Sequence, residues 1–355
     1  MTAATGIVGI VANPASGKDI RRLVAHGSSF DNNEKINIVR RVLLGLNATG
    51  VARVAFMPDT HAIVSRAARN LDLRFQLTPL EMPTLGNPGD SWEAARRLVD
   101  LGAGAIVTLG GDGTNRIVAK GCADIPLVPI STGTNNVFPT MVEGTLAGLA
   151  AGLVATGIAG SDADPNVTTH PRLDIMIDGS LADTALIDIV TTRSDWVGAR
   201  ALWDPARLSE IVVSRVTADQ IGMASIGGHL FPEAVDGPSG IHIVIAAHDR
   251  ANYQVQAPLA PGLMRSVPIA SASLIPRGTS VDLQSRPSIV ALDGEREFEI
   301  LEPDHQVSIL FNPSGPRTVN IAAALRAGSV AGRFVERMGE TAVSTSRECL
   351  ATVVD

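Results

Sequence analysis

The first half of the chain alternates short apolar runs with amphipathic stretches of helical length, and this alternation restricts the fold more than any other feature. Runs such as Gly6–Ala12 and Ala105–Leu109 are apolar almost throughout, which is typical of strands buried on both faces. Strands alternating with helices of about 10–15 residues predict a parallel sheet that helices cover on both sides. The expected strands are Gly6–Ala12, Val51–Met57, Leu73–Leu80, Ala105–Leu109 and Leu127–Ile130, and the expected helices are Asp31–Asn47, Thr60–Leu71, Asp90–Leu101, Thr114–Gly121 and Val142–Thr156.

The pattern changes after Ser161–Pro171, a polar segment that marks a predicted domain boundary. Beyond it, short strands are separated by turn signals. Asp178-Gly179 predicts a hairpin between Leu173–Ile177 and Ala185–Thr191, and Asp293-Gly294 predicts another tight turn. Further strands are expected at Glu210–Thr217, Ile241–Ala247, Val281–Gln284, Ser288–Leu292, Glu297–Leu301 and Gln306–Phe311.

These patterns predict an α/β fold class with an N-terminal parallel-sheet domain at residues 1–165 and a β-rich second domain at residues 166–318. The remaining residues, 319–355, form a C-terminal helical segment whose helix, Ile321–Met338, is expected to pack back on the first domain. In open parallel sheets, ligands bind at the carboxyl ends of the strands. The loops that follow the strands are therefore the candidate binding site.

Composition excludes several classes of protein. The 355 residues carry a net charge of −7 and only 3% aromatic side chains, which argues against a nucleic-acid surface or a basic membrane-facing patch. Cys122 and Cys349 form neither a disulfide framework nor a metal-ligand spacing. No signal-peptide pattern is present, so a cytoplasmic protein is expected. The apolar run Thr145–Gly160 is short and rich in Ala and Gly, which favours a buried helix over a membrane span.

The most informative motif, Leu109-Gly110-Gly111-Asp112-Gly113-Thr114, lies between a predicted buried strand and a helix. Glycines let the backbone approach a ligand closely, and free N–H groups at a helix N-terminus bind anions. A carboxylate in such a turn repels phosphate unless it meets a metal or a proton donor. Asp112 therefore suggests phosphoryl chemistry, as a base toward a hydroxyl or in a Mg²⁺ network. The alternative is a tight turn with a solvent-facing Asp112.

Two further loops follow predicted strands. Asn13-Pro14-Ala15-Ser16-Gly17-Lys18 departs from the Walker A phosphate loop, because Asp19 stands where Ser or Thr is required, yet it is able to cradle phosphate. Ser131–Pro139 is dense in short polar side chains that suit a nucleotide base or ribose. Judged singly, the first loop is as well explained as an ordinary surface turn, and a capped helix entry is the alternative for Ser131–Pro139. No G-x-G-x-x-G follows the first strand, which disfavours a dinucleotide-dependent dehydrogenase.

Together, Asn-Pro-x-Ser-Gly-Lys, Gly-Gly-Asp-Gly-Thr, Gly-Thr-x-Asn and Asp293-Gly294-Glu295 resemble the NAD kinase and diacylglycerol kinase superfamily in order and approximate spacing. The sequences of the segments Asn13–Leu23 and Thr134–Pro139 are most similar to the acetoin-catabolism protein X branch, an NAD-kinase-like group. The resemblance implies ATP and Mg²⁺ as cofactors, a nucleotide-binding first domain, an acceptor-binding second domain and a homo-oligomer. It implies a nucleotide and a small-molecule substrate as partners, with no nucleic acid and no membrane.

The same resemblance assigns roles to individual residues. Asp112 matches the family's catalytic aspartate, and Glu295 matches the lipid-kinase carboxylate near the reacting hydroxyl, although Glu295 is also explained as a mere hairpin residue. Asp188 is the acid that remains of the pair by which NAD kinases hold the dinucleotide ribose, with Ile187 in place of the family's Asn. The expected nucleotide-binding residues are Asn13, Ser16, Gly17, Lys18, Gly110, Gly111, Gly113, Thr114, Gly133, Thr134, Asn135 and Asn136.

The function expected from these observations is phosphoryl transfer from ATP to a hydroxyl of NAD or a related small metabolite, linked to acetoin catabolism. Ile187 puts NAD as acceptor in question, and it favours the alternative of a non-catalytic nucleotide-binding regulator. A lipid kinase of the diacylglycerol type is a further alternative, carried by Glu295. His229, His242 and His248 lack paired metal-ligand spacing and are expected to be structural or surface histidines. The polar and aromatic stretch Arg193–Trp203 suits either an acceptor pocket or an oligomer interface.

Overall fold

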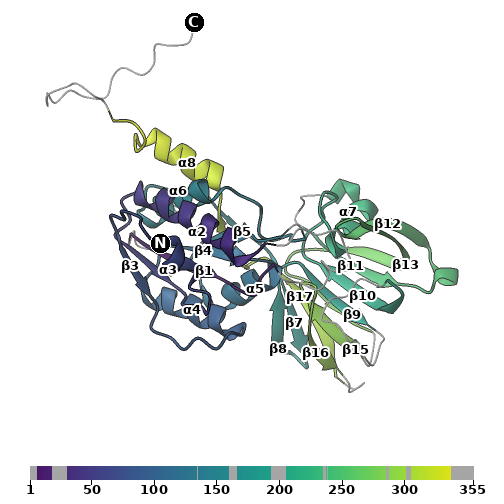
Figure 1. The fold of residues 1–355 in the computed structure, drawn as a ribbon. Helices are drawn as coiled ribbons and strands as arrows, with labels where there is room; N and C mark the ends of the chain where they lie inside the picture. Colours follow the sequence, from purple (N-terminus) through teal and green to yellow (C-terminus); the bar gives the residue numbers. More distant parts are fainter. Residues whose placement is uncertain are drawn as a thin grey trace, which may run out of the picture.

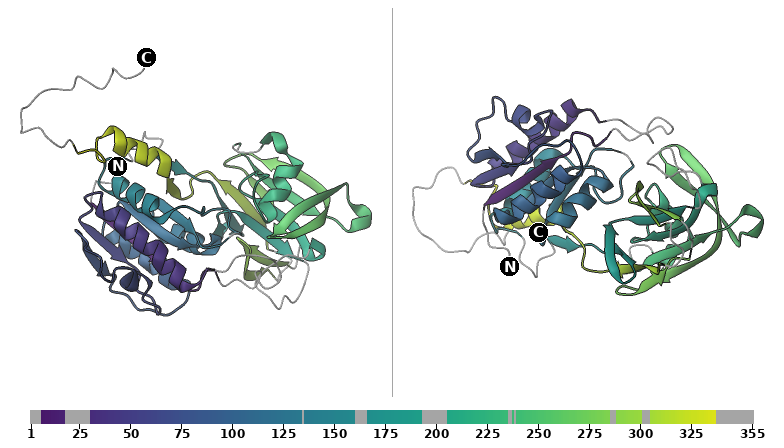
Figure 2. Two further views of the ribbon diagram at one scale, coloured as in Figure 1. Left: turned by 45° about the horizontal axis from the view of Figure 1, so that its top comes forward. Right: turned by 90° about the horizontal axis from the view of Figure 1, so that it is seen from below.

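The computed structural model describes residues 6–17, 30–133, 135–159, 166–192, 205–234, 237, 239–284, 288–300 and 305–336. They form two domains that lie side by side and are joined by strands crossing between them (Figures 1 and 2). The first domain is α/β and the second is built mainly of antiparallel strands, as the sequence predicts.

The first domain is organised around a seven-stranded sheet of order β3-β2-β1-β4-β5-β18-β6. Its parallel strands are β1 (Ile7–Ala12), β2 (Arg53–Phe56), β3 (Gln76–Pro79), β4 (Ala105–Gly110) and β5 (Leu127–Ser131). All six residues of β4 are buried, because helices cover both faces of the sheet. The helices are α2 (Asn32–Asn47), α3 (Ile63–Ala67), α4 (Gly89–Asp100), α5 (Asp112–Gly121) and α6 (Gly144–Ala155).

Helices α2 and α6 pack so closely that side chains are excluded from their contact. A Cβ atom on Gly45 of α2 would lie 2.9 Å from the backbone nitrogen of Leu149, and one on Gly148 of α6 would overlap the carbonyl oxygen of Val42. The many Ala and Gly residues of the apolar run Thr145–Gly160 are thus explained by the packing of α6 on α2 inside the first domain. No helix within the described ranges is long and apolar enough to cross a membrane.

The second domain contains two antiparallel sheets, of order β12-β13-β11-β10-β9-β15-β16 and β14-β17-β7-β8. Side chains such as Ile175, Val212 and Ile309 fill the space between them. The strands are β7 (Arg172–Ile177), β8 (Ser180–Ala185), β9 (Asp188–Thr192), β10 (Leu208–Val213), β11 (Gly240–Ile245), β12 (Tyr253–Ala260), β13 (Leu263–Ile275), β14 (Ser280–Asp282), β15 (Ser288–Leu292), β16 (Glu295–Ile300) and β17 (Val307–Asn312), and one helix, α7 (Met223–Leu230), joins them.

The chain crosses between the domains twice, and the two crossings lie beside each other. β6 (Val167–Thr169) leads into the second domain, and β18 (Arg317–Val319) leads back and pairs antiparallel with β6. Both strands belong to the first domain's sheet, so the predicted boundary at residue 166 falls just before the chain leaves that sheet. The closing helix α8 (Ile321–Val330) packs on α6, as expected, but ends earlier than Met338, the expected last residue.

Several local predictions were wrong. The helix expected from Thr114 begins at Asp112, which places that carboxyl in its first turn. The hairpin at Asp178-Gly179 pairs β7 with β8, so the expected second strand Ala185–Thr191 is in fact the end of β8 and most of β9. The strands β12 and β13 and the helix α7 were not predicted. β12 is an edge strand that contains Pro258 and alternates buried with exposed residues, so its apolar signal is weak.

The contact between α2 and α6 yields a stability prediction. Intrinsic helix propensity alone would make Gly148→Ala stabilising by about 1 kcal/mol. Because the added methyl overlaps a backbone carbonyl that cannot move aside, we expect the opposite, a loss of about 1–3 kcal/mol in the free energy of unfolding. Urea denaturation measures it. Leu146→Ala, at a position 44% exposed on the same helix, is the matched control and should change stability by less than about 0.5 kcal/mol. A stabilised Gly148→Ala variant would contradict the close approach.

Candidate active site

Three loops meet at the carboxyl edge of the first domain's sheet, because the strands that precede them, β1, β4 and β5, are neighbours. The Asn13 side chain donates a hydrogen bond to Thr114 Oγ1 at 2.9 Å, which joins the first loop to the second. Thr132 Oγ1 donates to Ser16 Oγ at 3.1 Å, which joins the third loop to the first. Residues that lie more than a hundred positions apart in the sequence thus form one cluster.

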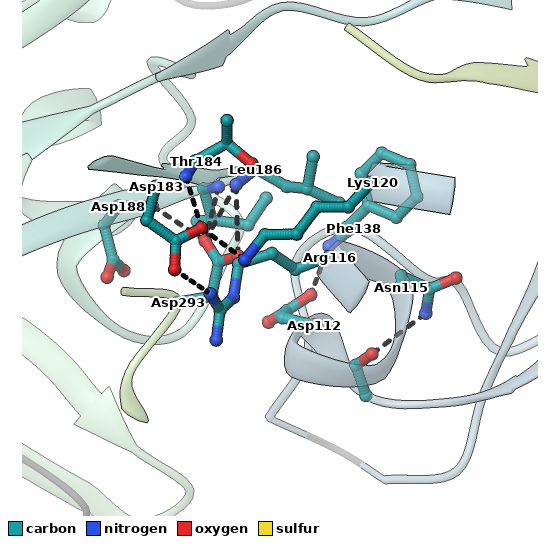
Figure 3. Close-up of polar contacts among 12 residues, drawn as sticks. Asp112, Asn115, Arg116, Lys120, Phe138, Asp183, Thr184, Leu186, Asp188 and Asp293 are labelled. Carbon is teal, nitrogen blue, oxygen red and sulfur yellow. Dashed lines mark hydrogen bonds and ion pairs between the residues drawn. The ribbon is translucent and has the colours of Figure 1, made fainter. Parts of the chain in front are cut away.

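Asp112 is held by the third loop. Its carboxylate accepts hydrogen bonds from the backbone N–H of Val137, at 3.1 Å to each oxygen. It also accepts one from the backbone N–H of Phe138, at 2.7 Å (Figure 3). N–H donors favour the charged form of a carboxylate, so this arrangement presents an anionic group at the start of α5. Asp112 is therefore a bound residue of the loop cluster and not a solvent-facing turn residue.

The glycines of the central loop permit close contacts that a side chain would block. A Cβ atom on Gly111 would lie 2.8 Å from Oδ1 of Asn136, and one on Gly110 would overlap the side chain of Thr114. A Cβ atom on Gly113 would lie 3.1 Å from a carboxylate oxygen of Glu295. Glu295 begins β16 in the second domain, so the carboxylate from one domain lies directly against the loop that carries Asp112 in the other.

Asp293 positions the tight turn between β15 and β16, which precedes Glu295. It has a φ of 51° and is followed by Gly294 at 78°, the left-handed geometry that the Asp-Gly pair predicts for a hairpin turn. Its buried carboxylate accepts hydrogen bonds from the backbone N–H of Leu186 (3.1 Å), Ile187 (2.7 Å) and Asp188 (3.3 Å). Burial raises the pKa of Asp293, whereas a neighbouring arginine and these amides oppose the rise. Asp293 thus ties β15 to the segment before β9.

Ion pairs between α5 and the second domain complete the contact (Figure 3). The Arg116 side chain, 2% exposed, lies with Nε 3.6 Å from Asp293 and with one terminal nitrogen 3.4 Å from Asp183. Lys120, one turn further along α5, also pairs with Asp183. Removing one partner of a buried pair leaves the other charge uncompensated, so these contacts restrict how the two domains sit.

The predicted acceptor residue, Asp188, lies next to this arrangement. It is 7% exposed, and its backbone carbonyl accepts from the N–H of Asp293 at 2.9 Å. Ile187, at the position where the resemblance predicts the Asn of NAD kinases, is 1% exposed and packs in the hydrophobic cluster shared by both domains. It therefore offers no polar group to a substrate.

Lys35 was not singled out as a site residue, yet it organises the first loop. Its ammonium group is fully buried and donates to the backbone carbonyls of Asn13 (3.0 Å), Pro14 (3.1 Å) and Ser16 (2.6 Å), and to the Asn32 side chain (3.1 Å). A positive charge behind the loop thus holds three of its carbonyl groups. One signal was available, since lysine occurs in this chain only at positions 18, 35 and 120.

A second group that the sequence did not reveal lies where the chain crosses between the domains. Arg215, which follows β10, donates to Nδ1 of His170 at 2.8 Å and lies 5.4 Å from the ring centroid of Phe138. The other ring nitrogen of His170 is 2.6 Å from the hydroxyl of Thr318, in the returning strand. Burial and the Arg215 charge lower the pKa of His170 to about 3, so its imidazole is neutral near pH 7.

The remaining candidates are placed as follows. Gly17 has a φ of 80° and lies against the carbonyl oxygens of Phe30 and Thr132. Gly133 exchanges hydrogen bonds with the Ser131 hydroxyl, and Asn135 Oδ1 is buried. The predicted residues Lys18 and Thr134 and the stretch Arg193–Trp203 lie outside the described residues.

Two of the three histidines singled out in the sequence have described side chains. His229 is exposed on α7, and His242 pairs with Glu210 at 2.9 Å inside the second domain. The side chain of His248 lies outside the described residues. No cluster of three or more His, Cys, Asp or Glu side chains able to hold a metal ion occurs in the part of the chain that is described. Cys122 is buried in the core, where burial raises the pKa of its thiol to about 12.

A carboxylate on a glycine-rich turn, two neighbouring polar loops and a second carboxylate from a β-rich domain form a site suited to handling phosphate. Two family models match the chain. Residues 8–158 match the model of the ATP-NAD kinase N-terminal domain, and residues 171–314 match that of the acetoin catabolism protein X C-terminal domain. The first domain is thus of the NAD kinase type.

The chain is 39% identical over 332 residues to the acetoin catabolism protein X of Cupriavidus necator (strain H16), covering 90% of this chain and 91% of that protein. It therefore belongs to the acetoin catabolism protein X family. A solved structure of a candidate diacylglycerol kinase from Bacillus anthracis str. Sterne matches 88% of this chain and 97% of its own, at 13% identity and a TM-score of 0.45.

The role of Lys35 leads to a stability prediction. Lys35→Met keeps the length of the side chain but leaves three buried carbonyl groups without their donor, so we expect the free energy of unfolding to fall by about 3 kcal/mol. Amide hydrogen exchange around Ser16 should also become faster. Leu44→Met, at a position 47% exposed on the same helix, is the control and should leave both unchanged. Unaltered exchange in Lys35→Met would show that the lysine does not organise the loop.

The neutral His170 predicts a specific pH dependence. Its pKa is about 3 in the folded protein and near 6.5 in the unfolded chain, so the unfolded chain binds a proton that the folded one does not as the pH falls below 6.5. Stability should then decline toward low pH by at most about 1.4 kcal/mol per pH unit from this group.

His170→Gln retains an acceptor for Arg215 and a donor for Thr318 but does not titrate. Between about pH 7 and pH 5, we expect its urea-unfolding free energy to fall by about 2 kcal/mol less than that of the wild type. His229→Gln, at an exposed position, should show the wild-type decline. Identical pH profiles for His170→Gln and the wild type would refute the assignment.

Proposed function

We propose that the protein is an ATP-dependent kinase that transfers a phosphoryl group to a hydroxyl of NAD or a related small metabolite in acetoin catabolism. The observation that carries the proposal is the contact between Glu295 and Gly113, which brings carboxylates from both domains to one phosphate-binding turn. The similarity to an acetoin catabolism protein supports the metabolic setting, and the NAD kinase match supports the nucleotide as donor.

The residues present fit a metal-nucleotide complex. Mg²⁺ keeps most of its waters and binds proteins through one or two carboxylates together with substrate phosphates. Asp112 and Glu295, whose carboxylates come from opposite domains to one turn, meet that requirement. When bound, the metal ion would neutralise charge on the phosphates, and Asp112 would be the residue that holds it.

The chain's own residues supply positioning and a proton acceptor. The first loop, backed by Lys35, and the N-terminus of α5 would hold the phosphates. Glu295 would accept the proton of the substrate hydroxyl. The hydroxyl oxygen would form a bond to the terminal phosphorus of ATP as the bond between that phosphorus and the ADP oxygen breaks. Phosphoryl transfer depends mostly on positioning and charge stabilisation, which the buried contact between the two domains would support.

One observation favours a second function. Ile187 is buried in the shared hydrophobic cluster, so the polar grip that NAD kinases place there is missing. A regulatory protein that binds the nucleotide without transferring phosphate would account for this. The same change also fits a kinase whose acceptor is smaller than NAD.

A phosphoryl-transfer screen tests the proposal. ATP and Mg²⁺ would be incubated with the protein and, separately, NAD, NADH, acetoin, butanediol or diacylglycerol, and products would be read by mass spectrometry. We expect one phosphorylated product, reduced at least about 100-fold in Asp112→Asn and Glu295→Gln. Glu299→Gln, at an exposed position on the same strand as Glu295, is the matched control and should retain full turnover.

The other outcomes discriminate between the candidates. ATP binding without any product would favour the regulatory protein. A product from diacylglycerol alone would identify a lipid kinase. Absence of ATP binding would overturn the nucleotide site itself. Thermal unfolding of each variant checks that lost turnover does not reflect lost fold.

A further inference from the structure

Among the described residues, the cations near Asp112 are already engaged, with one exception. Arg116 and Lys120 pair with Asp183 and Asp293, and Lys35 is held by the carbonyl groups of the first loop. None of these three is placed to meet an anionic ligand without giving up its present contacts. Arg215 is different, because its partners carry no charge.

Arg215 lies at the domain boundary between two neutral groups. One terminal nitrogen donates to Nδ1 of His170, and the guanidinium faces the ring of Phe138. His170 is neutral, since its pKa is about 3. Within the described residues, no carboxylate forms an ion pair with Arg215, and the bond to His170 is the only hydrogen bond that its side chain makes. Most of its five N–H donors are therefore available.

The position of Arg215 links it to the reacting region. Phe138, on which the guanidinium stacks, is the residue whose backbone N–H holds the Asp112 carboxylate at 2.7 Å. Burial lowers the pKa of Arg215, while the negative charges of Asp112 and Asp293 act in the opposite direction. Both carboxylates thus lie close enough to interact electrostatically with the guanidinium. The guanidinium stays protonated in any case. A guanidinium group with available N–H donors next to the proposed phosphate-binding turn has the geometry that phosphate recognition requires.

We propose that Arg215 contacts the terminal phosphate of the bound nucleoside triphosphate and neutralises its charge during transfer. This inference rests on the proposed function and extends it by assigning a residue of the second domain to the donor's reacting group. Phe138 and His170 hold the guanidinium without pairing its charge, which leaves the charge for the ligand. Because Arg215 belongs to the β-rich domain and the loops belong to the α/β domain, a triphosphate would bridge the two.

The test compares ATP with ADP, which lacks the terminal phosphate. Isothermal titration with Mg²⁺ would measure both nucleotides on the wild type, Arg215→Gln, Arg215→Lys and the control Arg265→Gln, at an exposed position on β13. We expect Arg215→Gln to weaken ATP binding about 10- to 100-fold, the loss typical of a charged hydrogen bond, and to leave ADP within about threefold. Arg215→Lys should lie in between, because a point charge replaces part of the interaction, and Arg265→Gln should match the wild type.

The outcomes separate the inference from the proposed function. If the wild type binds ATP and Arg215→Gln loses ATP and ADP equally, or loses neither, Arg215 does not contact the terminal phosphate and the inference is overturned while the kinase proposal stands. If the wild type binds no ATP, the proposed function fails and the inference fails with it. Retained ADP affinity in Arg215→Gln shows that the variant is folded, and Arg215→Lys provides the same comparison should the Gln variant unfold.

Discussion

The buried contact between Arg116 and Asp293 is the interaction on which the arrangement of the site depends. It joins α5, directly after the glycine-rich turn, to the β15–β16 turn that presents Glu295. Asp293 also holds three backbone N–H groups ahead of β9, so one carboxylate fixes the hairpin, its neighbouring strand and the facing helix. Such a pair is costly to bury and costlier to break, which keeps the two domains in one register.

The two domains contribute different kinds of groups to the site. The α/β domain supplies loops whose backbone and small side chains hold one another through the contacts of Asn13, Ser16 and Asp112. The β-rich domain supplies charged side chains, Glu295 and Arg215, that reach the same loops from the opposite side.

Sequence reasoning reached the class of fold because its evidence was local. Apolar runs with the length of a strand, an Asp31 cap on α2 and Asp-Gly turns act within a few residues, and the structure contains each of them. The same reasoning missed β12, β13 and α7. β12 is an edge strand that buries only alternate residues, and only three of the thirteen residues of β13 are buried. α7 is eight residues long and rich in glycine, so none of the three has a strong periodic signal.

The amino-acid sequence by itself determined the loops after the strands and the pair of carboxylates in recognisable motifs. Only the tertiary structure decided which groups face one another. Lys35 lies behind the first loop, Arg215 lies on Phe138, and Glu295 lies on Gly113, although none of these pairs has a sequence spacing that implies contact. Their meeting depends on how two domains pack through buried charges, and such packing leaves no periodic pattern in the chain.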